Sequence, residues 1–254
     1  MSRWAASARA RWLYHAHWLL QKLSGGRAGL RVYLICAQPV GTPALANLRD
    51  HANTRVVAVG PGDPLLQHFP RPTDVLTRRF ASGAVCHAVL VKGEFAGHIW
   101  LASGYYDEDE VRCRYVLPSA ATAWDFDVYV EPRFRGTRVI ARLWKGVDQA
   151  LRDRGVLWSY SRISLYNAGS IQAHEQLAAR YLCTGIFLTI GGLQAAWFTR
   201  PLRLKLTLGT RGTPVQAMPM PPGELPHHVQ TSAGDSLGST NLGRQMSPPP
   251  RRLD

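Results

Sequence analysis

Apolar residues follow a helical period at the start of the chain, then a strand period, then the two in alternation. Residues 3–23 contain no Gly or Pro and precede Gly25 and Gly26, which predicts an N-terminal helix. Its apolar stripe consists of Ala5, Ala8, Trp12, Ala16, Leu19, Leu20 and Leu23. We expect this stripe to pack on the domain with the arginines in solvent. The alternative is a basic, Trp-rich helix that lies on an anionic membrane.

Strand patterns dominate the next hundred residues. β-rich runs at 30–38 and 54–60 precede a Pro-rich stretch and a short capped helix over 73–83. Four consecutive antiparallel strands are then expected at 84–91, 94–103, 110–117 and 123–130. The acidic run 107–110 is expected to be a solvated turn; a rim that attracts a cationic substrate is the alternative.

After residue 130, helices alternate with strands. Helix-spaced apolar residues predict a helix over 138–153, and a second helix is expected within 167–180. Strands are expected at 156–165 and 181–190, the latter as the last strand. A strand–helix–strand unit needs parallel pairing or a crossover. The pattern therefore predicts a mixed α/β fold, in which a mostly antiparallel, twisted sheet carries helices on both faces.

Three segments divide the chain. A basic N-terminal helix occupies residues 1–28, and the folded domain occupies residues 29–208. Beyond residue 208 the chain is rich in Pro, Gly and Ser and loses its apolar period, so we expect disorder from about residue 211 onward. A short partner-binding motif in this tail is the alternative.

Charge and cysteines add limits on function. A net charge of +13 fits a nucleic acid, a membrane surface or an anionic nucleotide cofactor, and composition does not choose among them. No RNA-binding motif supports nucleic acid. Four scattered cysteines are typical of reduced core residues in a cytoplasmic protein, and the histidines lack metal-ligand spacing. No apolar run approaches the length of a membrane-spanning helix, and the N-terminus lacks the features of a secretory signal.

The stretch "YVEPRFRGTRVIARLW" (129–144) is a strand, a basic turn and then a helix, an order that gathers main-chain N–H groups where an anion binds. With "SRISLYNAGSIQAHEQLAARYL" (161–182), it resembles the GNAT acyltransferase superfamily over about residues 64–194. Val130, Pro132, Arg135 and Gly136 match the acyl-CoA pyrophosphate loop of that superfamily. Arg138 and Ile140 stand where the superfamily has glycines. Asn167, Ser170, His174 and Leu177-Ala178 resemble its second motif.

The resemblance implies an acyl-CoA site. The main chain of Val128, Tyr129 and Val130 would hold the thioester carbonyl, and Asn167 and Ser170 would contact the pantetheine arm. The pyrophosphate would lie on the loop residues Arg133, Arg135, Gly136, Thr137, Arg138 and Val139. We expect the guanidinium groups of Arg133, Arg135 and Arg138 to replace part of the missing glycine cradle. If CoA does not bind, this loop has lost the cofactor-binding function of the superfamily.

Proton transfer needs an acid and a base. His174 stands where the superfamily has a tyrosine acid, so the resemblance implies that it protonates the thiolate. A surface histidine without a role is the alternative. Asp125 and Asp127 are expected on one strand face, opposite Trp124 and Phe126, and are candidate bases. The alternative is that they pair with Arg112 or Arg114 on the neighbouring strand.

The leading hypothesis is a cytoplasmic GNAT-type N-acetyltransferase that uses acetyl-CoA or another acyl-CoA and no metal. It would transfer the acyl group directly to an amine or hydroxyl acceptor, a small molecule or a polymer. The alternatives are a GNAT-like module that binds without catalysis and a basic, membrane-surface or nucleic-acid-associated protein in which the domain is a scaffold. Residues 3–23 could make peripheral contact with the inner face of a membrane.

Overall fold

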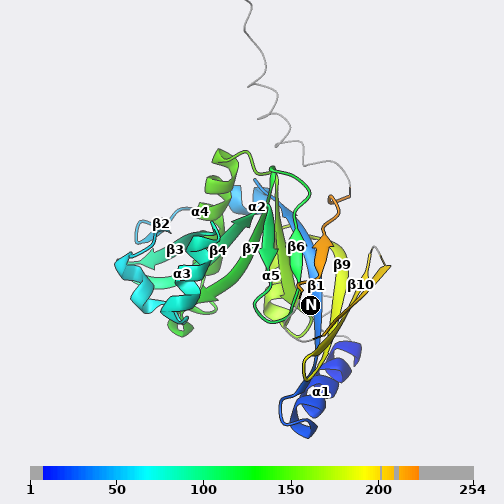
Figure 1. Cartoon of the computed structure of the whole chain (residues 1–254). Coiled ribbons are helices and arrows are strands. Elements are labelled where there is room, and N and C mark those ends of the chain that lie inside the picture. The colour runs from blue at the N-terminus through cyan, green and yellow to red at the C-terminus, as the bar shows by residue number, and fades with distance from the viewer. Residues whose placement is uncertain (1–7, 201, 209–211, 223–254) are drawn as a thin grey trace, which may run out of the picture.

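The computed structural model describes residues 8–200, 202–208 and 212–222 (Figure 1). Its centre is a twisted sheet in the order β11-β10-β9-β1-β8-β7-β4-β3-β2. These strands are β1 Ala28–Pro39, β2 Thr54–Val59, β3 Val85–Val91, β4 Glu94–Ser103, β7 Thr122–Val130, β8 Trp158–Ser164, β9 Arg180–Ile190, β10 Leu193–Thr199 and β11 Leu202–Leu208. Neighbouring strands are antiparallel except β7 and β8, which are parallel. The expected mixed, mostly antiparallel sheet is confirmed.

Helices cover both faces of this sheet, as expected. The helices α1 (Ala8–Leu23), α4 (Val139–Asp153) and α5 (Ala168–Gln176) share one face. The other face carries α3 (Thr73–Ala81) and a small sheet of β5 (Tyr105–Asp107), β6 (Arg114–Val116) and β12 (Val215–Ala217). Short turns of helix lie in the connections at α2 (Pro43–Ala46), η1 (Pro64–His68) and η2 (Pro132–Phe134).

Helix α4 forms because its apolar side chains recur at the helical spacing and meet the sheet. Val139, Leu143, Trp144, Val147 and Leu151 are all buried. The helix ends at Asp153, ahead of Gly155, whose φ of 70° is left-handed and suits glycine. The packing of α4 against β7 and β4 fixes where the helix begins, next to the end of β7.

The prediction that residues 110–117 form a strand of the main sheet beside β4 is wrong. Only Arg114–Val116 is extended, and it pairs with β5 and β12 in the small sheet. Strand β7 takes its place beside β4. The chain leaves the main sheet at Gly104, which has a φ of 75°, so the segment to residue 117 forms a separate flap over the core.

The C-terminal part differs from expectation as well. Strand β9 is not the last, because β10 and β11 extend the sheet as a hairpin. The tail is not disordered from residue 211: Val215–Ala217 pairs with β6 and Met218 is buried. A three-residue strand is too short to show a period in the sequence. Residues 223–254 lie outside the described part of the chain.

The N-terminal helix packs on the sheet with only part of the expected stripe. Leu13 and His17, which are outside that stripe, contact the sheet. Of the expected members, Ala16 and Leu20 are half-buried, whereas Trp12, Leu19 and Leu23 are exposed. The ring of Tyr166 packs against Tyr14 and His17. The expected stripe members before residue 8 lie outside the described residues.

Candidate functional site

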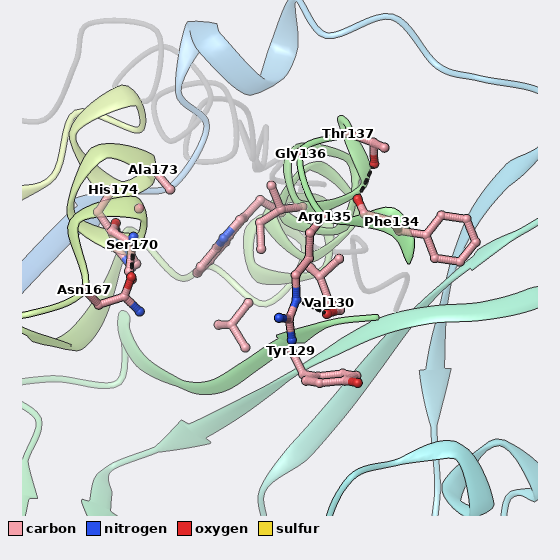
Figure 2. Close-up of a pocket in the computed structure, with 14 residues that line it drawn as sticks. Tyr129, Val130, Phe134, Arg135, Gly136, Thr137, Asn167, Ser170, Ala173 and His174 are labelled. Carbon is pink, nitrogen blue, oxygen red and sulfur yellow. Dashed lines mark hydrogen bonds between the residues drawn. The ribbon is translucent and has the colours of Figure 1, made fainter. Parts of the chain in front are cut away.

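A cleft of about 330 Å³ opens between the end of β7, the start of α4 and the start of α5. Its lining residues come from these three elements and are Val128, Tyr129, Val130, Phe134, Arg135, Gly136, Thr137, Ile140, Trp144, Asn167, Gly169, Ser170, Ala173 and His174. Figure 2 shows Arg135 on one side of this cleft and Asn167, Ser170 and His174 on the other.

The cleft exists because β7 separates from β8. Their parallel pairing ends at Asp125 and Ser161, while β7 continues to Val130 along β4. The main chain of Val128 to Val130 therefore has no partner strand on the β8 side and lines the cleft instead.

A β-bulge bends β7 at this point. Asp127 and Val128 together stand opposite Ile99, because the register with β4 shifts between His98 and Trp100. Asp127 has a left-handed φ of 46°. Gly97 is required just beyond, since a Cβ there would lie 2.3 Å from the Tyr129 carbonyl oxygen. The bulge reverses the alternation of side chains after Phe126.

The expectation that Asp125 and Asp127 share one face is therefore wrong. Asp125 faces the helices α4 and α5, and Asp127 faces the layer of α3. Neither residue lines the cleft, and neither pairs with Arg112 or Arg114. Strict alternation in the sequence does not reveal the extra residue of a bulge.

The loop between β7 and α4 brings one arginine to the cleft. Arg135 donates its Nε hydrogen to the Val130 carbonyl oxygen at 3.1 Å (Figure 2). Gly136 follows with a φ of 76°. Thr137 then closes the turn, because its hydroxyl donates to the Phe134 carbonyl at 2.6 Å. The loop places a guanidinium group and the N-terminus of α4 on the same side of the cleft.

The expected cluster of three arginines does not form. Arg133 points away, because its Nη1 lies 2.7 Å from Glu94 Oε2 and its guanidinium stacks on Phe134. Arg138 is the exposed N-cap residue of α4 and does not line the cleft. Val139 begins the helix with a buried side chain. A 3₁₀ turn over Pro132–Phe134 sends alternate side chains in different directions, which spacing alone does not show.

The opposite wall is the first turn of α5. Asn167 caps this helix by accepting a hydrogen bond from Ser170 N–H at 3.0 Å. One turn later, His174 is buried, with its ring edge-on to Trp144 at a centroid distance of 6.0 Å. The cap and the Trp144 contact fix the position of the wall residues Asn167, Ser170 and His174.

His174 belongs to a buried hydrogen-bond chain. Its Nδ1 donates to the Ser170 carbonyl at 2.8 Å, because a carbonyl only accepts. Its Nε2 lies 3.0 Å from Ser161 Oγ, and Ser161 donates in turn to Asp125. Ser159 donates to the second Asp125 oxygen at 2.7 Å. Because Ser161 donates its hydroxyl hydrogen to Asp125, its oxygen is left to accept a hydrogen bond from His174 Nε2.

Asp127 forms a separate, mostly buried ion cluster with Arg71 and Arg79, beside His98. Burial alone would raise the pKa of the Asp127 carboxyl, but contacts with His98, Arg71 and Arg79 outweigh burial and hold that pKa well below its usual range. Burial lowers the pKa of His98 below its ordinary value, although the Asp127 carboxylate beside it acts in the opposite direction. The cluster anchors the bulge to α3.

The acidic run 107–110 is not a fully solvated turn. The Glu108 side chain is completely buried, with Oε2 2.7 Å from Arg162 Nε. Burial raises the pKa of Glu108 to about 7, although the nearby Arg162 charge lowers it. Glu110 accepts a hydrogen bond from Tyr33 at 2.6 Å. The run holds the small sheet onto the core.

Most of the predicted cofactor residues meet at the cleft, together with the predicted acid His174, and several lining residues were not predicted. Those that meet are Val128, Tyr129, Val130, Arg135, Gly136, Thr137, Asn167, Ser170 and His174. Phe134, Ile140, Trp144, Gly169 and Ala173 were not predicted as site residues. Trp144 and Ile140 follow the loop at helical spacing from each other, and this spacing is typical of a core-facing helix as well as of a cleft wall. Among the described residues, no group of three His, Cys, Asp or Glu is placed to hold a metal.

A strand that leaves its parallel partner beside a helix N-terminus brings main-chain N–H groups and the positive end of the helix dipole to one cleft, an arrangement that suits an anion. The model of the acetyltransferase (GNAT) family matches residues 45–178, more than half of the chain. The chain belongs to this family, which uses acyl-CoA as co-substrate and whose fold supports acyl transfer in general.

Several solved structures are similar to this chain. A GNAT-family protein from Novosphingobium aromaticivorans is 21% identical over 64% of this chain and 66% of its own, with a TM-score of 0.44. A tandem GNAT protein from the clavulanic acid biosynthesis pathway is 14% identical over 63% and 53%, with a TM-score of 0.47. The ribosomal-protein-S18-alanine N-acetyltransferase from Escherichia coli is 17% identical over 49% and 76%, with a TM-score of 0.39.

The chain thus spans about two thirds of the first of these relatives and about half of the second. No curated protein sequence matches the chain significantly.

Proposed function

We propose that this protein is an N- or O-acyltransferase that moves an acetyl or other acyl group from acyl-CoA directly to an amine or hydroxyl acceptor. The observation that carries the proposal is the meeting of three features at one cleft. These are the unpaired edge of β7 at Val128–Val130, the start of α4, and the Arg135 guanidinium. Together they suit a pantetheine arm that ends in a pyrophosphate.

Binding follows from these features. The bond from Arg135 Nε to Val130 leaves the two Nη groups for the pyrophosphate, beside the helix N-terminus. Asn167 and Ser170 face this loop across the cleft and are placed to contact the pantetheine arm. Main-chain N–H groups at Val128–Val130 would hold the thioester oxygen, where negative charge develops in the transition state.

In the reaction the acceptor nitrogen or oxygen attacks the thioester carbon, the new C–N or C–O bond forms, and the C–S bond breaks. The acceptor loses a proton to solvent water, and the leaving thiolate takes one up. We assign to His174 Nε2 the proton that the thiolate takes up. The His174 ring would turn from Ser161 toward the cleft to donate it. Asp125 would position the His174 ring through its hydrogen bond with Ser161. The proposal assigns the base to neither Asp125 nor Asp127.

Turnover is the direct test of this proposal. Acetyl-CoA is incubated with the protein and a panel of amines and alcohols, and release of the free CoA thiol is recorded. We expect release that depends on the acceptor, and a His174→Phe variant that loses turnover on the order of 10²-fold while acyl-CoA affinity changes little. If acyl-CoA binds but no free CoA thiol is released with any acceptor of the panel or any acyl chain length, a non-catalytic module is favoured.

Binding is measured separately by thermal shift. A ligand at about 100 times its Kd adds about 2.7 kcal/mol to the free energy of unfolding. If neither acetyl-CoA nor longer acyl-CoAs raise the melting temperature, both the acyltransferase and the non-catalytic binding module are contradicted.

A further inference from the structure

Exposed apolar side chains are concentrated at one end of the molecule. Of the 16 large hydrophobic side chains that are exposed among the described residues, 12 lie on α1 or on β9, β10 and β11. Those on the strands are Leu188, Ile190, Leu193, Trp197, Leu204, Leu206 and Leu208. Those on the helix are Trp12, Tyr14, Trp18, Leu19 and Leu23. We call these twelve residues the apolar end.

The strand residues form one continuous surface. Directly paired residues of antiparallel strands point to the same face, and the register pairs Leu193 with Ile190 and Leu208, and Trp197 with Leu204. Exposure is greatest on the outer strand β11, at 65–74%, compared with 36–55% on β9 and β10. The opposite face of the same strands is buried, with Phe187 and Phe198 in the core. One-sided burial leaves an apolar face that the described chain does not cover.

Helix α1 continues this surface. Leu13 packs in the same cluster as Leu30 and Ile186, so α1 lies on the face of the sheet that carries the apolar strand residues. Figure 1 shows α1 beside the lower ends of β9 and β10. Arg27, just after α1, accepts a hydrogen bond from Gly191 N–H at 2.7 Å, which ties the end of the helix to the β9–β10 turn.

The segments that form the apolar end contain no acidic residue. Between Met1 and Arg49, and again from Gln176 to Gly223, the sequence has Arg and Lys but neither Asp nor Glu. Lys22 lies over the Trp18 ring at 4.9 Å, and Arg27 and Arg203 are exposed. A second copy of the chain would bring like charges together here, whereas an anionic surface would attract them.

We propose that the apolar end docks on an anionic lipid bilayer, with its Trp and Leu side chains in the interface and its Lys and Arg at the headgroups. No helix in the described part of the chain is long and apolar enough to cross a membrane. The proposed contact is peripheral, and it would hold the cleft near the membrane surface. This inference does not depend on whether the cleft is catalytic.

Co-sedimentation with vesicles tests the proposal. Full-length protein is mixed with phosphatidylcholine vesicles, with or without phosphatidylserine, at low and high salt. We expect binding to the anionic vesicles that is released by salt, and weak binding to the neutral ones. Leu206→Glu places a charge in the apolar end and should weaken binding at least about 10-fold. Val85→Glu, at an exposed apolar position on β3, should bind like the wild type.

Other outcomes would overturn the proposal. These are no binding to anionic vesicles at low salt, equal binding by the wild type and Leu206→Glu, or a wild-type dimer that Leu206→Glu dissociates in the absence of lipid. Far-UV circular dichroism and melting temperature confirm that both variants fold. If Leu206→Glu does not fold, Trp197→Ser takes its place in the comparison.

Discussion

At the scale of single residues, the candidate site depends on how His174 is held. Its Nε2 lies against Ser161, which links it to the buried Asp125, whereas Ser159 contacts Asp125 but not His174. If the proposed reaction uses His174, Ser161→Ala should lower kcat by about 10-fold with an unchanged KM for acyl-CoA, and should alter the pH profile of kcat.

Ser159→Ala is the matched control for this change. It also removes one hydrogen bond to Asp125 from the same strand, and its pH profile should follow that of the wild type. If Ser161→Ala and Ser159→Ala have the same pH profile of kcat, Ser161 has only a structural role. Restoration of the profile by Ser161→Thr would support a role of the hydroxyl group.

Asp127 has a structural role that pH can test. Its pKa is depressed, so its contribution to stability is present at neutral pH and is lost as the pH falls below about 4. Asp127→Asn removes one of the two carboxylate partners of the buried Arg79, the other being Asp109, and should cost about 2 kcal/mol at pH 7. The difference between variant and wild type in urea unfolding should shrink toward pH 3.

Asp74→Asn provides the comparison for this prediction. Asp74 pairs with Arg78 on the surface of α3, one residue before Arg79, and its loss should change stability by less than about 1 kcal/mol. An Asp127→Asn variant as stable as Asp74→Asn would contradict the account of the ion cluster.

At the scale of elements, the bend in β7 shapes the cleft, and Gly97 on β4 permits it. A methyl group at Gly97 would meet the main chain of Tyr129 and Val130, so β4 and β7 must shift. Gly97→Ala should therefore destabilise the protein by about 2 kcal/mol and weaken acyl-CoA binding. Gly60→Ala, where a Cβ meets no atom within 4 Å, should leave both unchanged. A stable Gly97→Ala variant with normal binding would show that the bend tolerates movement.

The sequence predicts elements better than it predicts the irregularities that build the site. Helix α4 follows from apolar spacing because it buries one regular face, and strands β3 and β4 follow from apolar runs because both of their faces are buried. The bulge at Asp127 does not, since one extra residue leaves the local pattern of Trp124 to Val130 strand-like. The direction of Arg133 depends on Glu94, which is distant in sequence. The alternating leucines of β11 were a readable strand signal that was missed.

At the scale of the whole molecule, the two proposed sites lie on different parts of the surface. The acyl-CoA cleft lies where β7, α4 and α5 meet, and the apolar end lies across β9–β11 and α1. The sheet order places β8 and β1 between β7 and β9. The cleft and the apolar end therefore use different strands, and we expect Leu206→Glu to retain the acyl-CoA affinity of the wild type.

The central claim is that acyl-CoA binds in this cleft through Arg135. The most direct measurement is calorimetric titration of acetyl-CoA into the wild type, Arg135→Ala and Arg133→Ala at low and high salt. We predict that Arg135→Ala loses about 10-fold or more in affinity, that the loss shrinks at high salt, and that Arg133→Ala changes little because Arg133 pairs with Glu94. No binding by the wild type, or equal losses in both variants, would contradict the claim.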